Sequence, residues 1–84
     1  ALITSSEKKI ASFILEYFDL KKYFSLILTR EDTPKNKPDP MPYLKALEYC
    51  KLKNIEVVIL EDSKCGIQAA ASSTIPYIKA SWYL

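Results

Sequence analysis

The sequence predicts an α/β fold in which a mostly parallel sheet is flanked by helices. Short apolar runs of three or four residues alternate with segments whose apolar side chains repeat at helical spacing. In chain order these segments give strand, helix, strand, helix, strand, helix and strand, an alternation that is typical of layered α/β sheets. Of the 84 residues, 49% are hydrophobic and 26% charged, which is the composition of a globular domain rather than of a disordered chain.

The first half of the chain supplies two predicted strands and one predicted helix. Residues 1–3 read as the end of a buried strand, and residues 26–28 read as the second strand. Between them, apolar side chains fall at positions i, i+3, i+4, i+7 and i+8, namely Ile10, Phe13, Ile14, Tyr17 and Phe18. This spacing predicts a helix with one apolar face. We interpret four aromatic side chains as packing residues: Tyr17, Phe18, Phe24 and Tyr49.

The second half of the chain supplies two further helices and two further strands. The inner face of the second helix is expected to carry Leu44, Leu47 and Cys50. Residues 57–60 are apolar without interruption and rich in β-branched side chains, which is typical of a strand covered on both faces. A short third helix is indicated by Ile67, Ala70 and Ala71. Residues 76–78 read as a fourth strand. Gly66, the only glycine, is expected to let the third helix approach its neighbours closely.

A proline-rich segment separates the second predicted strand from the second predicted helix. Four of the five prolines lie in residues 33–43. Because proline fixes φ and biases the preceding residue towards extended geometry, this segment is predicted to be a stiff loop. Asp39 can cap the helix that follows, and Pro40 suits its first turn. The loop also carries Lys35, which we expect to face solvent, and Lys37.

Charge and composition exclude several classes of protein. Twelve basic and ten acidic side chains leave a net charge of +2, which is too weak to indicate nucleic acid or a membrane surface as a partner. The longest apolar run, residues 57–60, is far too short for a helix that spans a bilayer. The chain contains no histidine, so a Ser-His-Asp triad or a histidine-ligated metal cannot be built from it.

The two cysteines, Cys50 and Cys65, do not have the spacing of a zinc site. We interpret them as free, partly buried thiols in a reducing compartment and therefore expect a cytoplasmic protein. A disulfide between them stays open at this point.

Polar side chains follow three of the predicted strands, at the point where each strand ends. Thr4, Ser5 and Ser6 follow the first strand, Thr29 and Arg30 the second, and Glu61, Asp62 and Ser63 the third. Ligands of open α/β sheets bind beyond the carboxyl ends of the strands. One edge of the sheet is therefore expected to hold hydroxyls, two adjacent carboxylates and, from the stiff loop, Lys37.

This set of side chains suits phosphate chemistry with a hard cation. Glu61 and Asp62 supply oxygen ligands for Mg²⁺, which prefers one or two carboxylates together with water and substrate phosphate. Thr4 and Ser5 offer hydroxyls beside the start of a helix, where phosphoryl oxygens bind. Lys37 is a compact positive charge that can offset charge on a phosphoryl group in transfer.

Each of these features also has a purely structural interpretation. Thr4 and Glu7 have the spacing of a capping box, in which the threonine caps the helix and the glutamate reaches back to it. Glu61 and Asp62 could form an acidic helix start that the helix dipole favours. Lys37 alone would be an ordinary solvated lysine. The joint occurrence of these residues, in this order and at strand ends, favours the phosphate site.

Three segments resemble motifs of the haloacid dehalogenase-like hydrolases. Residues 1–6 resemble the second motif, a hydrophobic strand that ends in threonine or serine. Residues 36–40, followed by Tyr43, resemble the "GKPxP" loop of the third motif. Residues 57–70 resemble the fourth and most specific motif, "hhhhEDSxxGhxAA". The resemblance runs over nearly the whole chain and is strongest to the branch of β-phosphoglucomutases and phosphoglycolate phosphatases.

The resemblance implies a role for each matched residue. Thr4 and Lys37 would be the catalytic groups: Thr4 would hydrogen-bond the phosphoryl oxygens, with Ser5 assisting, and Lys37 would hold the phosphate and the nucleophile. Asp62, with Glu61 directly or through water, would hold Mg²⁺. The substrate would be a small phosphorylated metabolite, and the reaction would pass through an aspartyl-phosphate.

The family's first motif, "DxDGT", has no counterpart in the sequence, although it supplies the nucleophilic aspartate. In the family its strand lies between those of the second and fourth motifs. The resemblance therefore implies that residues 1–84 are the C-terminal part of a Rossmann-like core domain that lacks its central strand and its cap. We expect such a chain to be inactive alone and to expose unpaired strand edges through which another chain could pair.

Two alternatives compete with this interpretation. A non-catalytic α/β interaction or regulatory module would explain the missing nucleophile. A phosphoacceptor receiver domain is disfavoured, because such domains place their acidic pair first and their lysine last along the chain, whereas Thr4 and Lys37 here precede Glu61 and Asp62. The substrate, the choice between phosphatase and mutase, and the oligomeric state stay open.

Overall fold

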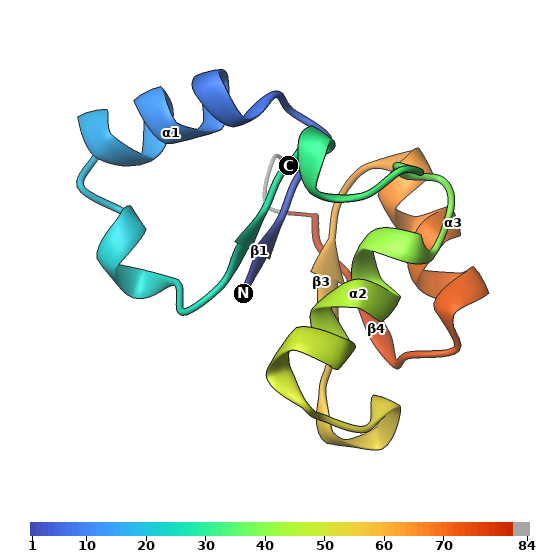
Figure 1. Cartoon of the computed structure of the whole chain (residues 1–84). Helices are drawn as coiled ribbons and strands as arrows, with labels where there is room; N and C mark the ends of the chain where they lie inside the picture. The colour runs from blue at the N-terminus through green and yellow to red at the C-terminus, as the bar shows by residue number, and fades with distance from the viewer. Residues whose placement is uncertain (82–84) are drawn as a thin grey trace.

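The computed structural model describes residues 1–81 and confirms the predicted α/β alternation (Figure 1). Its strands and helices, in chain order, are β1 (Leu2–Ile3), α1 (Lys8–Tyr17), β2 (Ile27–Leu28), α2 (Met41–Cys50), β3 (Ile59–Glu61), α3 (Lys64–Ser73) and β4 (Tyr77–Lys79). Single turns of 3₁₀ helix lie at Lys21–Tyr23, Arg30–Asp32 and Asn54–Glu56. Within residues 1–81, no helix is both long enough and apolar enough to cross a membrane.

The strands form two separate parallel pairs. β1 pairs with β2, with Leu2 opposite Ile27, and β3 pairs with β4, with Ile59 opposite Tyr77. In the part of the chain that the structure describes, no ladder joins β1 to β3. Each of these two strands therefore has one edge without a partner strand.

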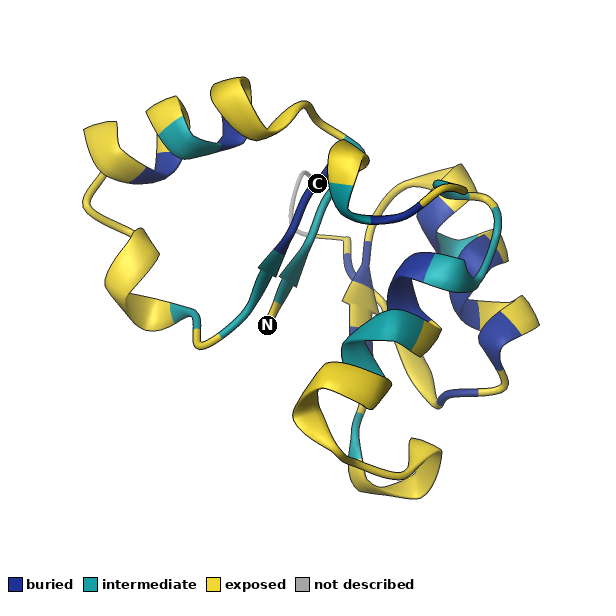
Figure 2. Ribbon diagram, viewed as in Figure 1, coloured by how far each residue is buried: buried dark blue, intermediate teal, exposed yellow. Residues whose placement is uncertain are grey.

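The core lies where α3 packs against the β3–β4 pair and α2 packs against α3 (Figure 2). Its buried members are Tyr43, Ile59, Ala69, Ala70 and Ile75. Ile3, Leu47 and Val57 pack against this cluster and are partly buried. Because alanine has only a methyl side chain, Ala69 and Ala70 let α3 lie close to the strands, and both are fully buried. This packing places the carboxyl end of β3 beside the first turn of α2.

The prediction that the apolar face of α1 packs against the rest of the chain is wrong. Its five apolar residues are all exposed, with Phe13 at 69% and Tyr17 at 74%, and the residues that α1 buries are Ala11 and Leu15. Phe13 and Tyr17 stack with their ring centroids 6.2 Å apart, and Tyr17 meets Phe18 edge-on at 5.0 Å. These side chains are exposed because nothing in residues 1–81 covers this face.

Other predicted packing positions also need correction. Tyr49 is exposed and Phe24 is half-buried, so the packing interpretation fails for Tyr49 as it does for Tyr17 and Phe18.

The inner face of α2 also differs from the prediction. Leu47 packs against the core as predicted, but Leu44 and Cys50 are exposed and Tyr43 takes the inner position. The difference is one of helix phase, because α2 begins at Met41 and turns Pro42 and Tyr43 inward.

The predicted third strand, third helix and cysteines differ in detail from the structure. β3 begins two residues later than expected and includes Glu61, with Ile59 and Glu61 buried and Leu60 exposed. The strand is therefore covered on one face rather than on both. The predicted third helix is confirmed as α3, in which Ala70 is buried and Ala71 is exposed. Cys50 and Cys65 are free, as the first interpretation held, but both are exposed rather than partly buried.

Candidate functional site

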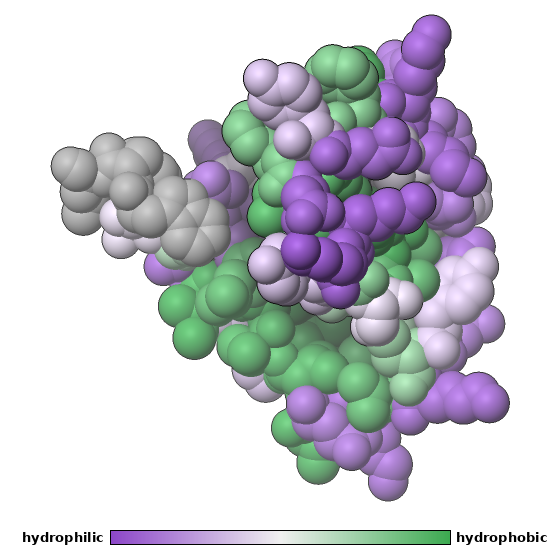
Figure 3. Space-filling view, turned by 90° about the vertical axis from the view of Figure 1, so that its left-hand side faces the viewer, coloured by the Kyte–Doolittle hydropathy of each residue, from purple (hydrophilic) through white to green (hydrophobic). Residues whose placement is uncertain are grey.

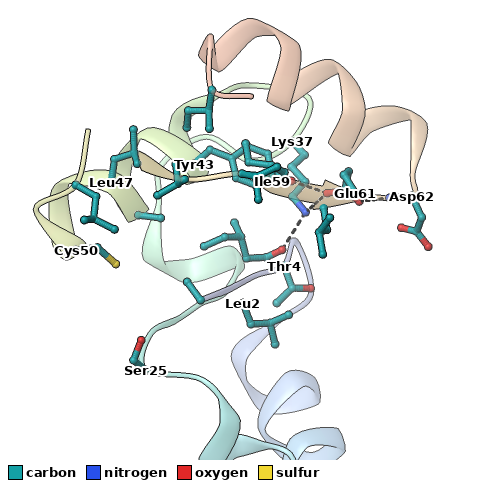
Figure 4. Close-up of a pocket in the computed structure, with 18 residues that line it drawn as sticks. Leu2, Thr4, Ser25, Lys37, Tyr43, Leu47, Cys50, Ile59, Glu61 and Asp62 are labelled. Atoms are coloured by element: carbon teal, nitrogen blue, oxygen red, sulfur yellow. Dashed lines mark hydrogen bonds and ion pairs between the residues drawn. The ribbon is translucent and has the colours of Figure 1, made fainter. Parts of the chain in front are cut away.

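A cavity of about 690 Å³ lies between β1 and β3, with α2 along one side (Figure 4). Apolar side chains of the two strands and of α2 form most of its wall, including Leu2, Leu47, Val58 and Leu60. In the space-filling view, apolar side chains surround a hollow on the face that is turned towards the viewer (Figure 3). Polar side chains gather at one end of the cavity: Thr4, Lys37, Glu61 and Asp62. That end is the one beyond the carboxyl ends of β1 and β3.

Lys37 joins the two strand ends. Its Nζ donates to the backbone oxygen of Ile3 at 2.9 Å and to Oε2 of Glu61 at 2.8 Å. The stiff loop carries Lys37 to this position, and the Lys37–Pro38 peptide bond in it is cis. Because an ammonium group has three N–H donors, one of them stays available for a ligand. The lysine is 12% exposed, so it is not the ordinary solvated lysine of the structural interpretation.

Glu61 accepts hydrogen bonds on both carboxylate oxygens. Oε2 binds Lys37 and also accepts from the Tyr43 hydroxyl at 2.5 Å. Oε1 accepts from the backbone N–H of Asp62 at 3.1 Å, from that of Ser63 at 3.3 Å and from the Ser63 hydroxyl at 3.2 Å. Burial alone would raise the pKa of Glu61, but the hydrogen bonds from Lys37 and Tyr43 and the charge of Lys37 outweigh it and lower the pKa to about 2. Glu61 is therefore a fixed, ionised anchor for Lys37.

Gly66 confirms the predicted close approach of α3. A Cβ at this position would overlap the side chain of Glu61, at its carboxyl carbon. The helix begins at the next residue after Ser63, whose hydroxyl accepts the Gly66 N–H at 3.0 Å as an N-cap. The glycine and the cap together seat the Glu61 carboxylate against the start of α3.

Asp62 lies at the outer end of the site. It is exposed, and its carboxylate takes part in none of the hydrogen bonds or ion pairs found among residues 1–81. Residues 1–81 contain no group of three or more histidine, cysteine, aspartate or glutamate side chains that could hold a metal ion. Asp62 alone fits the requirement of Mg²⁺ for at least one free carboxylate, with the remaining positions left to water and phosphate.

Thr4 lies directly after the residue that binds Lys37. Its backbone N–H donates to Leu28 at 2.9 Å, and its Oγ1 accepts the Ser6 N–H at 3.1 Å, which leaves the hydroxyl hydrogen free to donate. The predicted capping box with Glu7 does not form. The first turn of α1 is instead capped by Glu31, whose carboxylate accepts the Lys8 N–H at 2.9 and 3.2 Å.

Ser5 is the one predicted phosphate-binding residue that does not line the cavity. The chain turns away from the cavity here, and the Ser5 backbone oxygen accepts from Nε of Arg30 at 2.9 Å. The N-cap of α2 is Pro40 rather than the predicted Asp39, which lies one residue earlier and accepts the Met41 N–H on Oδ1 at 2.8 Å.

Tyr43 is a site residue to which the sequence motifs assign no role. It follows the third motif by a few positions, but an aromatic residue at the start of a helix is usually a packing residue. The signal that could have identified Tyr43 is its position in the first turn of the helix that directly follows the Lys37 loop. Its ring lies in the core at 6% exposure, while its hydroxyl reaches Glu61.

Comparisons with known proteins agree with these motifs. Residues 1–80 match the family model described as haloacid dehalogenase-like hydrolase. A phosphorylated carbohydrates phosphatase of Thermotoga maritima is 40% identical over 78 residues, and a phosphoglycolate phosphatase of Thiobacillus denitrificans is 36% identical over 76 residues. These alignments cover 93% and 90% of the chain, but only 36% and 34% of the relatives. The chain thus spans about a third of the length of these relatives.

Solved structures share the fold. A crystal structure from Thermotoga maritima, which carries the provisional name β-phosphoglucomutase, superposes with a TM-score of 0.87 at 34% identity over 94% of this chain and 37% of that one. A HAD-superfamily hydrolase of subfamily IA from Geobacter sulfurreducens gives a TM-score of 0.84 at 27% identity over 92% of this chain and 36% of that one. The chain therefore belongs to the haloacid dehalogenase-like hydrolases, in the branch of the β-phosphoglucomutases and phosphoglycolate phosphatases.

Proposed function

We propose that the chain forms the phosphate-binding part of a Mg²⁺-dependent phosphatase or phosphomutase that acts on a small phosphorylated metabolite in the cytoplasm. The observation that carries this proposal is the position of Lys37, whose ammonium group contacts both Ile3 and Glu61. Because Thr4 follows Ile3 and Asp62 follows Glu61, this one lysine brings three remote segments to a single rim.

The chain's own groups have defined tasks at this rim. The third N–H of Lys37 and the hydroxyl of Thr4 donate to phosphoryl oxygens and stabilise the negative charge that spreads over them in the transition state. Glu61 holds Lys37 in place, since it is ionised and hydrogen-bonded on both oxygens.

Mg²⁺ would be held by the free carboxylate of Asp62, and Glu61 would contribute through water because its own oxygens already accept hydrogen bonds. When bound, the cation supplies positive charge that polarises the phosphoryl group.

The nucleophile would be an aspartate on a separate strand, which forms the aspartyl-phosphate. Two observations support a strand between β1 and β3. Both strands border the same cavity, and neither has a partner on the side that faces it in residues 1–81. Val58 and Leu60 are 54% and 60% exposed there, so an added strand would bury them. Another polypeptide could pair with the chain through these edges.

Complementation tests the proposal. The purified 84-residue chain is expected to show no turnover of p-nitrophenyl phosphate. Addition of a polypeptide that carries an apolar strand ending in Asp-x-Asp is expected to restore Mg²⁺-dependent hydrolysis. Lys37→Met and Asp62→Asn should abolish the restored activity, whereas Lys35→Met, on the same loop but exposed, should preserve it.

Two results would contradict the proposal. Turnover by the chain alone would show that no second strand is needed. Binding of the added polypeptide without any hydrolysis would favour the alternative function, a non-catalytic interaction or regulatory module.

A further inference from the structure

We propose that Tyr43 is a positioning residue, whose hydroxyl fixes the Glu61 carboxylate and through it the Lys37 ammonium group in the orientation that binds a phosphoryl group. The inference rests on the proposed function, because it assigns Tyr43 to the lysine that the proposed function assigns to phosphate.

The two donors meet on one oxygen atom. The Tyr43 hydroxyl lies 2.5 Å from Oε2 of Glu61, and Nζ of Lys37 lies 2.8 Å from the same atom. Nζ also lies 5.3 Å from the centre of the Tyr43 ring, which is within the range of a cation–π contact. Lys37 thus contacts both the Glu61 oxygen to which Tyr43 donates and the ring of Tyr43 itself.

Tyr43 is rigid enough to serve as a reference point. Its ring is buried in the core cluster with Ile59, Ala69 and Ile75, and its backbone N–H bonds to Pro40 at 3.1 Å in the first turn of α2. Lys37, in contrast, ends a flexible four-carbon stem on a loop. A buried tyrosine is therefore the more rigid of the two donors that bind Oε2 of Glu61.

Core packing alone does not require the hydroxyl. Phenylalanine would fill the same volume among the core side chains, and only the hydroxyl oxygen of Tyr43 reaches Glu61. A carboxylate oxygen that accepts from two donors has its orientation defined by both of them, and outer groups of this kind orient the residues that touch a ligand. Oε1 keeps its donors at the start of α3 without the hydroxyl, but Oε2 then loses the one rigid donor that orients it towards Lys37.

Tyr43→Phe separates positioning from packing, and Tyr49→Phe is the matched control, because Tyr49 is an exposed tyrosine on the same helix. The readout is the pair of Hε resonances of Lys37 in the NMR spectrum of the full 84-residue chain. A held lysine gives two distinct Hε shifts, and a freely rotating one gives a single averaged shift. We expect two shifts in the parent chain and in Tyr49→Phe, and one in Tyr43→Phe.

Binding of inorganic phosphate gives the second readout. Loss of the hydroxyl is expected to weaken phosphate binding about tenfold, the effect of losing one hydrogen bond in a charged network. Amide hydrogen exchange at Ile59 and Ala70 reports whether the core stays intact. A variant with 4-aminophenylalanine at position 43 restores a donor at the same place, so it should recover both Hε shifts and the phosphate affinity even if Tyr43→Phe fails to fold.

The outcomes distinguish the inference from the proposed function. Two Hε shifts and unchanged phosphate affinity in a folded Tyr43→Phe chain would overturn the role of Tyr43. Failure of 4-aminophenylalanine to recover the parent behaviour would also overturn it. If Lys37→Met binds phosphate as well as the parent chain does, the proposed function itself fails.

Discussion

Nζ of Lys37 and Oε2 of Glu61 lie 2.8 Å apart, with side chains that are only 12% and 8% exposed. This pair joins a loop to the end of β3 across 24 positions of sequence. A buried ion pair contributes little net stability compared with apolar side chains, but it is costly to break on one side, because an unpaired charge is left in the interior. A functional role for the lysine therefore accounts for the buried pair better than stability alone does.

Lys37→Met is expected to destabilise the chain by about 3–5 kcal/mol, because the Glu61 carboxylate loses its charged partner while it stays buried. Urea denaturation of both chains measures the free energy of unfolding. The double variant Lys37→Met/Glu61→Gln should recover part of the loss, since neither side chain is then charged. Lys35→Met is the control and should change stability by less than about 0.5 kcal/mol, as expected for an exposed side chain. Equal losses in the two lysine variants would contradict the buried pair.

Acid should destabilise the chain through Glu61. The pKa of Glu61 is about 2 in the folded chain, below its ordinary value of 4.5. Above pH 4.5 the carboxylate is ionised in both states, and its contribution to stability is complete. As the pH falls from about 4.5 to 2, the unfolded chain takes up the proton first, so up to roughly 3 kcal/mol of stability is lost.

Urea midpoints measured in metal-free buffer between pH 6 and pH 2 test this dependence. Glu61→Gln should flatten the profile between pH 4.5 and 2, and Glu16→Gln, which removes an exposed carboxylate on α1, should leave it unchanged. A Glu61→Gln profile as steep as that of the parent chain would show that Glu61 is not the group responsible.

Gly66→Ala is expected to displace the Glu61 side chain, because the new Cβ would overlap its carboxyl carbon. The overpacking should cost roughly 1–3 kcal/mol, although glycine to alanine in an open helix position usually stabilises. Ser72→Ala, at an exposed position of the same helix, is the control. A crystal structure or NMR chemical shifts of Gly66→Ala should also show that the contact between Lys37 and Glu61 is lost. A higher free energy of unfolding in Gly66→Ala would mean that α3 does not lie in close contact with Glu61.

Asp62→Asn is expected to remove Mg²⁺ binding without loss of stability, because the Asp62 carboxylate is exposed and has no partner in residues 1–81. Isothermal titration with Mg²⁺ measures the first effect, and urea denaturation in the absence of metal measures the second. Glu16→Gln serves again as the control for the loss of one negative charge. Unchanged Mg²⁺ affinity in Asp62→Asn would place the metal elsewhere.

The sequence predicts the order of elements and the rim of the site because both depend on local signals. Strand ends followed by polar residues mark Thr4 and Asp62, and the proline-rich loop that carries Lys37 is visible as composition. The only glycine of the sequence predicts a close approach of the third helix, and the structure shows that the neighbour is the Glu61 side chain.

The sequence predicts burial less well because burial depends on which layers are present. The spacing on α1 correctly predicts a helix with an apolar face, yet Phe13 and Tyr17 stay exposed because nothing in residues 1–81 covers them. The phase of a helix is similarly uncertain: a start at Met41 turns Tyr43 inward in place of Leu44. The contact between Tyr43 and Glu61 joins residues 18 positions apart, and no local pattern encodes it.

Residue-resolved NMR titration of the 84-residue chain with inorganic phosphate in the presence of Mg²⁺ tests most directly whether three remote segments share one ligand. The amide of Thr4, the Hε resonances of Lys37 and the amide of Asp62 are expected to shift together along one saturation curve. The shifts should weaken when Mg²⁺ is removed. If these three residues follow separate curves, or if their resonances stay in place while others move, the chain has no common phosphate site at the ends of β1 and β3.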